Sequence, residues 1–377
     1  MIDTKARRFW EPLLASADIR LGGDRSWDIR VNRDRFFRRL VRQGELGAGE
    51  AYMDGDWDCD RLDLLISKTA GVKLRELIPK GWRARLAGLA SLLRNPNPRR
   101  KAFEIGRRHY DIGNDLYGAM LDPRMTYTCA YWRGLDHAPE NLAAAQEAKL
   151  ELVCRKLDLR PGMRVLDIGG GWGSLARYAA ERHGASVVNV TVSKEQVELA
   201  DRLCAGLPVV NRLQDYREVK ERFDRVVSIG MFEHVGVKNY RTYMEVARRC
   251  LEPGGRFLLH TIAQNAGAPT NLWTTTYIFP NSELPALSQI AKAAEGLFVM
   301  EDCHNIGANY DPTLMAWWHN FDAAWPRLRG KYGERFYRMW KMYLQGSAGS
   351  FRSRSLQVWQ VVLTPNGISG GFALSRA

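Results

Sequence analysis

A strand-like segment that runs into a cluster of glycines constrains this chain more than any other feature. Within residues 165–168 only Asp167 is polar, which is typical of the end of a buried strand. Four glycines follow within residues 169–173, and a helical pattern begins after them. Glycines at a strand-to-helix turn let the backbone approach a ligand closely and adopt φ angles that other residues avoid. The segment therefore predicts a nucleotide-type pocket, and a purely structural turn is the alternative.

The residues around these glycines indicate which class of nucleotide the pocket binds. The dinucleotide fingerprint needs a glycine where this chain has Ser174, and an acidic residue at the end of the next strand, yet residues 185–191 contain none. The Gly-Lys-Ser/Thr sequence of a P-loop does not follow the glycines either. A Gly-x-Gly-x-Gly turn after Leu-Asp-Ile is a form used for S-adenosylmethionine (SAM). We therefore favour a methyltransferase over a dehydrogenase.

The amino-acid composition limits the kinds of protein that this chain can be. The chain has 377 residues, of which 45% are hydrophobic, enough for a core in one large domain with an appendage or in two domains. No apolar run approaches the length of a membrane span. Glu11 and Pro12 interrupt the segment after the basic N-terminal residues, so we expect no secretory signal. The six cysteines lie far apart without a Cys-x-x-Cys pair, which predicts reduced thiols in a cytosolic protein.

The formal net charge of +13 concentrates in the N-terminal quarter, above all in residues 73–108. Basic residues there alternate with leucines and Trp82, a pattern suited to an anionic membrane surface. A solvated helix of a basic protein explains the same pattern. No nucleic-acid-binding signature accompanies the charge, so we expect no nucleic-acid partner. Residues 95–98, Asn-Pro-Asn-Pro, are the best candidate for a linker.

Residues 15–68 mix a strand-like piece (17–21) with a helical one (35–43), which predicts a small α+β domain without chemistry of its own. The acidic residues within 51–58 indicate a solvated turn more than a metal site. After residue 142 the patterns alternate, which predicts a parallel sheet covered by helices on both faces, with a ligand at the carboxyl ends of the strands. The expected helices are 142–157, 194–205 and 239–251, and the expected strands are 185–191, 208–213, 223–229, 254–262 and 355–363.

Several polar residues follow the predicted strands. Glu233 comes after strand 223–229, and His260 lies near the end of strand 254–262, with Ile262 on the same face. Tyr310 precedes a helical segment in a predicted loop. A single residue of these kinds is usually structural. Glu233 and His260 at neighbouring strand ends are a stronger indication of function, because chemistry gathers at that edge of a sheet.

Six longer segments carry a resemblance to a known family. The chain resembles the cyclopropane-fatty-acyl-phospholipid synthases and the mycolic acid cyclopropane synthases, and the resemblance covers nearly its whole length. Its segments include His-Tyr-Asp-Ile-Gly-Asn-Asp at 109–115 and Gly-Met-Phe-Glu-His-Val-Gly at 230–236. The others are residues 49–58, 125–132, 277–281 and 308–317.

The resemblance implies an α/β fold: a Rossmann-like, seven-stranded SAM methyltransferase sheet in residues 96–377, preceded by a small α+β domain in residues 1–95. That first domain, with the basic linker, would present lipid and form a homodimer. The resemblance also implies a cytoplasmic protein attached peripherally to the inner face of the bacterial cytoplasmic membrane, at an anionic phospholipid surface.

The activity implied is transfer of a methylene from SAM to the cis double bond of an unsaturated phospholipid acyl chain. The product is a cyclopropane ring, formed through a carbocation that a bound bicarbonate ion deprotonates. A SAM-dependent lipid C-methyltransferase that makes methyl-branched chains is the alternative within the same class. A lipid-binding protein without turnover is the alternative from another class, and retention of both the glycines and the bicarbonate residues argues against it.

The resemblance also assigns residues. SAM would be held by Tyr127, Thr128, Gly169, Gly170, Gly171, Thr191, Gln196, Gln214 and Asp215. Bicarbonate would be bound by Cys129, Glu233, His260, Ile262 and Tyr310, with no metal. Glu233, His260 and Tyr310 would orient this base, an aromatic face such as Tyr127 would stabilise the cation, and no cysteine would act as a nucleophile.

Three positions depart from the family pattern. Gly170 stands where relatives often have Cys or Ser, a change that we expect the backbone turn to tolerate. Asn189 replaces a common glycine, with an expected small effect on the adenosine pocket. Ser347 occupies a position that is often Cys.

Overall fold

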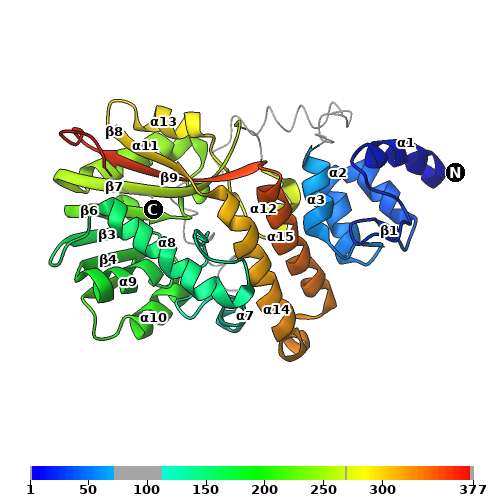
Figure 1. Ribbon diagram of the computed structural model, residues 1–377, viewed down its shortest axis with the longest axis horizontal. Helices are drawn as coiled ribbons and strands as arrows, with labels where there is room; N and C mark the ends of the chain where they lie inside the picture. The colour runs from blue at the N-terminus through cyan, green and yellow to red at the C-terminus, as the bar shows by residue number, and fades with distance from the viewer. Residues whose placement is uncertain (1, 72–112, 268–269, 374–377) are drawn as a thin grey trace. The chain divides into compact units, whose positions relative to one another are not determined.

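The computed structural model describes residues 2–71, 113–267 and 270–373 (Figure 1). The predicted membrane-binding stretch at 73–108, the linker at 95–98 and residues 109–112 of one family segment lie outside this part of the chain. The chain divides into two compact units. One comprises Met1–Asn95, Thr270–Pro280 and Asp311–Leu356, and the other comprises Pro96–Pro269, Asn281–Tyr310 and Gln357–Ala377.

The second unit contains the predicted seven-stranded sheet, in the order β5-β4-β3-β6-β7-β9-β8. Strands β5, β4, β3, β6 and β7 pair in parallel, whereas β8 pairs with β9 antiparallel. The bounds are β3 (Arg164–Ile168), β4 (Ser186–Thr191), β5 (Val209–Leu213), β6 (Phe223–Ile229), β7 (Leu251–Gln264), β8 (Val299–Asn305) and β9 (Leu356–Thr364). The five predicted strands are confirmed. The sequence pattern missed β8, which is mostly polar.

Helices cover both faces of this sheet, as predicted. Figure 1 shows α8 (Leu142–Leu157), α9 (Ser174–His183) and α10 (Lys194–Leu203) on one face, with α11 (Tyr240–Arg249) and α13 (Leu287–Ala294) on the other. The short helix α7 (Asn114–Met120) precedes them in the chain. The predicted helices at 142–157, 194–205 and 239–251 correspond to α8, α10 and α11.

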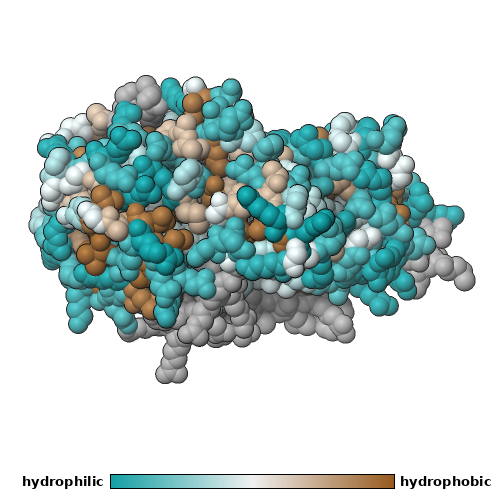
Figure 2. Space-filling model, turned by 90° about the horizontal axis from the view of Figure 1, so that it is seen from below, coloured by the Kyte–Doolittle hydropathy of each residue, from teal (hydrophilic) through white to brown (hydrophobic). Residues whose placement is uncertain are grey.

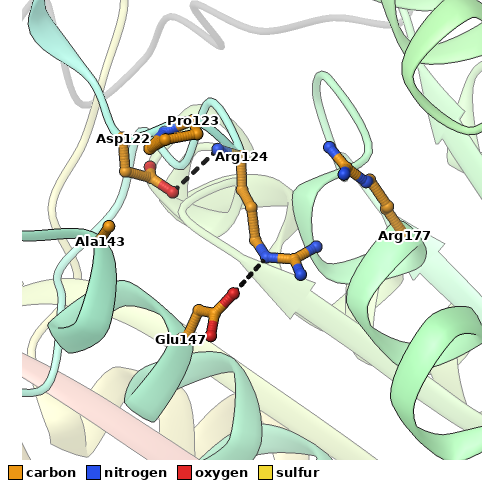
Figure 3. A pocket seen from close by; sticks show the side chains of 6 residues that line it. All are labelled: Asp122, Pro123, Arg124, Ala143, Glu147 and Arg177. Atoms are coloured by element: carbon orange, nitrogen blue, oxygen red, sulfur yellow. Dashed lines mark hydrogen bonds and ion pairs between the residues drawn. The ribbon is translucent and has the colours of Figure 1, made fainter.

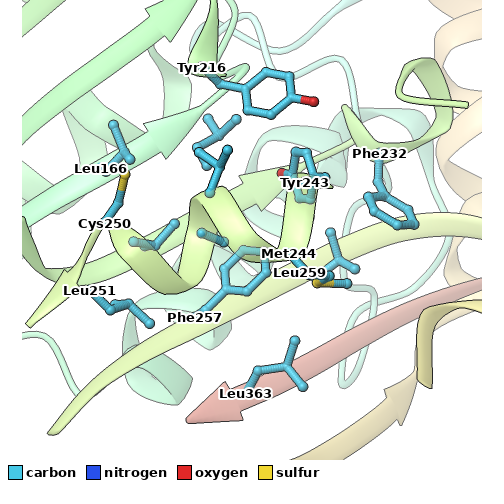
Figure 4. Packing of buried hydrophobic residues seen from close by; sticks show 14 of the residues in the cluster. Leu166, Tyr216, Phe232, Tyr243, Met244, Cys250, Leu251, Phe257, Leu259 and Leu363 are labelled. Carbon is cyan, nitrogen blue, oxygen red and sulfur yellow. The ribbon is translucent and has the colours of Figure 1, made fainter. Parts of the chain in front are cut away.

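Alternate residues of β3, β4, β6, β7 and β9 build two separate hydrophobic cores, because successive side chains of a strand point to opposite faces. Leu166, Phe257 and Leu363 pack with α11 and α13 in one core (Figure 4). Their neighbours in the chain pack with α8 and α9 in the other core; these are Val165, Leu258 and Val362. The two cores fix the register of the sheet and therefore the positions of the residues at its carboxyl edge.

The first unit is mainly helical. It contains α1 (Ile2–Ser16), α2 (Arg35–Met53), α3 (Leu62–Gly71), α12 (Leu272–Tyr277), α14 (Tyr310–Tyr332) and α15 (Glu334–Arg352), apart from the first residue of α14. Two-residue strands β1 (Arg30–Val31) and β2 (Trp57–Asp58) pair antiparallel. The predicted strand at 17–21 is wrong: Asp18 turns the chain with a φ of 56°, and Leu21 forms only an isolated bridge to Ile29.

The acidic residues near the end of α2 do not form the solvated turn that the sequence predicts. Asp56 is completely buried, and its carboxylate pairs with Arg35 and Arg39 at 2.6 and 3.2 Å. Asp54 pairs with Arg39 at 2.7 Å. Buried carboxylates need such partners because desolvation of an isolated charge is costly. Among the described residues no group of acidic, His or Cys side chains is arranged to hold a metal ion.

The surface shown in Figure 2 is mostly hydrophilic and is interrupted by separate hydrophobic groups. Both edge strands expose apolar side chains, Val210 and Leu213 on β5 and Val299 and Met300 on β8. No helix in the described ranges combines the length and the apolar character that crossing a bilayer requires.

Close packing of α15 on α3 yields a prediction for stability. A Cβ on Gly349 would lie 2.3 Å from the backbone oxygen of Asp63, so Gly349→Ala should destabilise the first unit by about 1–3 kcal/mol through overpacking. Gly330, in α14, has open space around its Cβ position. The control Gly330→Ala should instead stabilise by up to about 1 kcal/mol. Chemical denaturation of both variants tests this, and equal effects of the two substitutions would contradict the packing argument.

Candidate active site

The glycine turn lies at the carboxyl end of β3, in the middle of the sheet. Gly169, Gly171 and Gly173 all have positive φ, of 77°, 58° and 80°, which explains why glycine is needed at these positions. The Gly169 N–H donates to Val190 O at 2.8 Å and so ties the turn to the end of β4. The turn exposes its backbone at the edge where parallel sheets bind ligands, as the sequence predicts.

Gly170 is crowded by two side chains. A Cβ at this position would lie 2.3 Å from Asp167 Oδ2 and 2.5 Å from Asn189 Oδ1. Both side chains are buried, so neither has solvent to turn into. A Cys or Ser at Gly170 would require the Asp167 and Asn189 side chains to shift, so we expect the turn of this chain to tolerate it less readily than the sequence alone suggests. Asn189 also donates through Nδ2 to Asn211 Oδ1 at 2.9 Å, and so joins β4 to β5 beside the turn.

Asp167 is a candidate ligand residue that the assignment by family resemblance did not include. Neither carboxylate oxygen has a hydrogen-bond donor among the described residues, although the side chain is 1% exposed. Burial raises the pKa of Asp167 to about 7, and the nearby Lys149 ammonium opposes that rise. The sequence did single out this residue, because Asp167 is the one polar residue within 165–168.

Four more of the predicted SAM residues lie at or shortly after the ends of β4 and β5: Thr191, Gln196, Gln214 and Asp215. Thr191 Oγ1 donates to Gln196 Oε1 at 2.7 Å, and the Gln214 N–H donates to Thr191 O at 3.0 Å. Gln196 also approaches the Cβ position of Gly171, at 3.5 Å. These contacts bring the three residues to the same edge as the glycine turn. Asp215 is buried, but Arg217 donates to both of its carboxylate oxygens.

The loop that carries Tyr127, Thr128 and Cys129 is anchored on both sides. Asp122 accepts hydrogen bonds from the backbone N–H groups of Arg124 and Thr126, at 3.0 and 2.8 Å. Arg124 in turn donates to Glu147 of α8 at 2.9 Å, beside a small cavity of about 170 Å³ (Figure 3). This cavity lies outside the predicted site residues, and its charged side chains serve to fix the loop.

Two further contacts hold the loop against the sheet. Thr126 Oγ1 and Ser174 Oγ lie 2.7 Å apart, which links the loop to the first residue of α9. The methyl carbon of Thr128 lies 3.0 Å from the Cβ position of Gly230, whose N–H donates to His260 O at 2.9 Å. The loop therefore reaches both the predicted SAM residues and the predicted bicarbonate residues.

Glu233 and Ile262 are joined directly. The Ile262 N–H donates to Glu233 Oε1 at 2.7 Å, whereas Glu233 Oε2 is buried and has no donor among the described residues. Burial raises the pKa of Glu233 to about 7. A buried carboxylate with one unfilled oxygen fits a ligand that brings its own O–H or N–H group.

His260 lies on β7, opposite Ile229 of the neighbouring strand β6. Its Nδ1 is 3.3 Å from Gln360 Nε2 of β9. Gln360 Oε1, like Glu233 Oε2, is a buried acceptor to which no described residue donates a hydrogen bond. Burial, together with the charges of Lys149 and Lys156, lowers the pKa of His260 well below its usual value. His260 is therefore neutral and accepts at Nδ1 from Gln360, which leaves its other ring nitrogen as the donor.

Two contacts connect the loop that carries Cys129 to the segment immediately before Tyr310. The Cys129 thiol is within 3.9 Å of Ile306 O, and the 3₁₀ turn Gly307–Asn309 follows Ile306 directly. Asn309 Oδ1 accepts from the Trp132 N–H at 2.8 Å, which ties the same loop to this turn. Tyr310 is buried and is the first residue of α14, where the sequence predicted a loop.

Comparison with known proteins agrees with this arrangement. Residues 97–361 match the family described as mycolic acid cyclopropane synthetase. The Escherichia coli (strain K12) cyclopropane-fatty-acyl-phospholipid synthase is 49% identical over 98% of this chain and 96% of its own length. The Mycobacterium tuberculosis (strain ATCC 25618 / H37Rv) tuberculostearic acid methyltransferase UfaA1 is 34% identical over 89% of this chain and 82% of its own.

The fold also matches a solved structure with a bound ligand. The crystal structure of the mycolic acid cyclopropane synthase CmaA1 complexed with SAH and CTAB superposes with a TM-score of 0.64 at 31% identity. The match covers 71% of this chain and 98% of that chain.

The crowding at Gly170 predicts coupling between two positions. Gly170→Ser should destabilise the second unit by about 1–3 kcal/mol, because the new side chain meets Asp167 and Asn189. Adding Asn189→Gly should recover part of the loss by opening space beside the turn, a coupling of about 0.5–3 kcal/mol. Denaturation of the two single variants and the double variant measures it. Strictly additive effects would show that Asn189 does not limit the residue at position 170.

Proposed function

The chain belongs to the mycolic acid cyclopropane synthetase family and is a SAM-dependent methyltransferase, and from this premise we propose its reaction. It transfers a methylene from SAM to the cis double bond of an unsaturated acyl chain in a membrane phospholipid, and forms a cyclopropane ring. The 49% identity to a cyclopropane-fatty-acyl-phospholipid synthase over nearly the full length of both chains is the main support.

The residues at the glycine turn fit SAM. The turn presents its backbone to the ligand. The buried carboxylate of Asp167 accepts no hydrogen bond from a described residue, and it is therefore suited to accept one from the amino group of the ligand. The residues that would hold SAM are Tyr127, Thr128, Gly169, Gly170, Gly171, Thr191, Gln196, Gln214 and Asp215. When bound, SAM supplies the electrophilic methyl group; the protein fixes its position and keeps out water.

The residues around Glu233 fit a bicarbonate ion, which would supply a base. Glu233 Oε2 can accept the O–H of that ion, and neutral His260 can donate to one of its oxygens. Tyr310, Cys129 and Ile262 would complete the set. In this proposal Glu233, His260 and Tyr310 orient the base and do not themselves remove the proton.

Cysteine chemistry is not part of this proposal. The Cys129 thiol donates to Ala130 O at 3.3 Å and is fully buried. The alkene itself supplies the electrons for the new carbon–carbon bond, so a covalent thiol adduct would remove the nucleophile that the reaction needs. Tyr127, whose ring centre lies 5.1 Å from that of Tyr117, offers an aromatic face to stabilise a developing cation.

The lipid substrate requires access to a membrane. We propose that the basic residues within 73–108 attach the protein to an anionic phospholipid surface on the cytoplasmic side, and that the first unit supports a homodimer. The charge of this stretch and its interleaved apolar residues support the membrane contact.

A lipid C-methyltransferase that makes methyl-branched chains is the second candidate. The similarity to a tuberculostearic acid methyltransferase favours it, but at 34% identity against 49% for the cyclopropane-fatty-acyl-phospholipid synthase. The two candidates differ only in the fate of the carbon after its transfer.

The reaction predicts a selective product. Purified protein incubated with SAM and vesicles of anionic phospholipid should convert unsaturated acyl chains to species heavier by one CH₂, with one SAH released for each conversion. Vesicles with only saturated chains are the control and should remain unchanged, because they offer no double bond. Lipid mass spectrometry measures both; SAH release without any lipid product would contradict the proposal.

Glu233→Gln separates catalysis from SAM binding. The amide oxygen of Gln can still accept from the Ile262 N–H, so the fold should persist, but its NH₂ group replaces the free acceptor Oε2. We expect turnover to fall by about a hundredfold with SAH affinity unchanged.

Glu283→Gln is the matched control for this substitution. Glu283 Oε2 also accepts a backbone N–H, that of Val237 at 2.8 Å, but Glu283 is not one of the proposed bicarbonate residues. Turnover of this control should stay close to wild type. Loss of SAH affinity in Glu233→Gln, in parallel with loss of turnover, would place Glu233 in the SAM site instead.

A further inference from the structure

Among the buried polar side chains of helix α8, Gln146 and Lys149 contact the loop at residues 127–129 and are not yet used by the proposed mechanism. Gln146 and Lys149 are 0% and 1% exposed, and residues three apart lie on the same side of a helix. Gln146 Nε2 donates to Thr128 O at 2.8 Å, and Lys149 Nζ donates to Thr128 Oγ1 at 3.0 Å. Both side chains therefore hold the residue that lies between Tyr127 and Cys129.

The face of the sheet that packs against α8 is polar near its ligand-binding edge. Val165, Leu258 and Val362 belong to the core shared with α8. The residues two positions away on the same strands point to the same face; they are Asp167, His260 and Gln360. The electrostatic influence of Lys149 on Asp167 and on His260 agrees with this common location.

Lys149 differs from the other buried lysine of the same helix. Lys156 is completely buried and forms an ion pair with Asp302 at 2.9 Å. Lys149 has no carboxylate in ion-pair contact within the described residues, and the hydroxyl of Thr128 is the one hydrogen-bond acceptor that these residues provide. An ammonium group has three N–H donors, so two of them remain for a ligand or water.

A buried cation of this kind is costly unless an anion balances it. Burial lowers the pKa of Lys149 to about 8, which leaves the side chain mostly charged at neutral pH. An anion bound at residues 127–129 would remove the imbalance. The proposed function brings two such anions to this loop, the carboxylate of SAM and bicarbonate, and both present the same carboxylate chemistry.

We propose that Lys149 is a positioning residue of the ligand site, which holds Thr128 and provides the positive charge that balances a carboxylate-type anion bound at residues 127–129. This inference rests on the proposed function, since that function supplies the anion. It adds to the site a residue that none of the predicted ligand sets contains.

Calorimetry with two ligands tests the proposal. SAH carries the carboxylate, whereas 5′-methylthioadenosine keeps the adenosine and the sulfur but lacks the amino-acid portion. Lys149→Met removes the charge at nearly constant volume, and Lys149→Arg retains it. In a third assay, the rate of methyl transfer is measured against bicarbonate concentration at saturating SAM.

If Lys149 balances the carboxylate of SAM, Lys149→Met should weaken SAH binding by about tenfold or more and leave 5′-methylthioadenosine binding within about twofold of wild type. If it balances bicarbonate, SAH binding should stay unchanged, but half-maximal stimulation should need about tenfold more bicarbonate. In either case Lys149→Arg should recover most of the loss. Lys156→Met is the control, expected to lower the Tm but neither ligand affinity.

Two outcomes would overturn the proposal: equal weakening of SAH and 5′-methylthioadenosine, which indicates a merely structural role, or no change in any of the three assays. Wild-type protein that does not bind SAH would instead contradict the proposed function itself. Should Lys149→Met fail to fold, Lys149→Gln provides the test, because its amide can still donate a hydrogen bond but carries no charge. It should reproduce the loss, and ligand responses equal to those of wild type would reject the role of the Lys149 charge.

Discussion

The site depends on a change from apolar to polar residues along one face of the sheet. Val165, Leu258 and Val362 pack against α8 and fix its position. Two positions away on the same strands, the same face carries Asp167, His260 and Gln360. The apolar layer is an ordinary hydrophobic core. The polar layer contains carboxylate and amide oxygens that no described residue satisfies, which is costly in a folded protein without a ligand. The fold therefore stabilises a set of groups whose hydrogen bonds a ligand must complete.

Much of this arrangement could be predicted from the sequence. Strand and helix periodicity identified the parallel strands and α8, α10 and α11, because each element buries a regular apolar pattern. The glycine turn was recognisable because three of its glycines need positive φ. Glu233 and His260 were predicted at neighbouring strand ends, and β6 and β7 are indeed adjacent. The residue assignments for SAM and bicarbonate came from resemblance and remain predictions.

The rest depends on contacts between segments distant in sequence. Lys149 and Gln146 look like ordinary surface residues of an amphipathic helix, since polar side chains on a helix are usually solvated; only the packing of α8 shows that both are buried. Gly170 appeared replaceable because the sequence does not reveal that Asp167 and Asn189 fill the space above it. The segments 270–280 and 311–356 were assigned to the catalytic domain, yet they belong to the same compact unit as the N-terminal residues.

The central claim is that a carbon transferred from SAM closes a ring after it loses a proton. The most direct measurement uses SAM whose methyl group carries three deuterium atoms, unsaturated phospholipid vesicles and mass spectrometry of the product. Ring closure predicts a product that retains two deuterium atoms on the new carbon, because one leaves as the ring forms. A product that retains all three would contradict the account and would identify the protein as a lipid C-methyltransferase that makes branched chains.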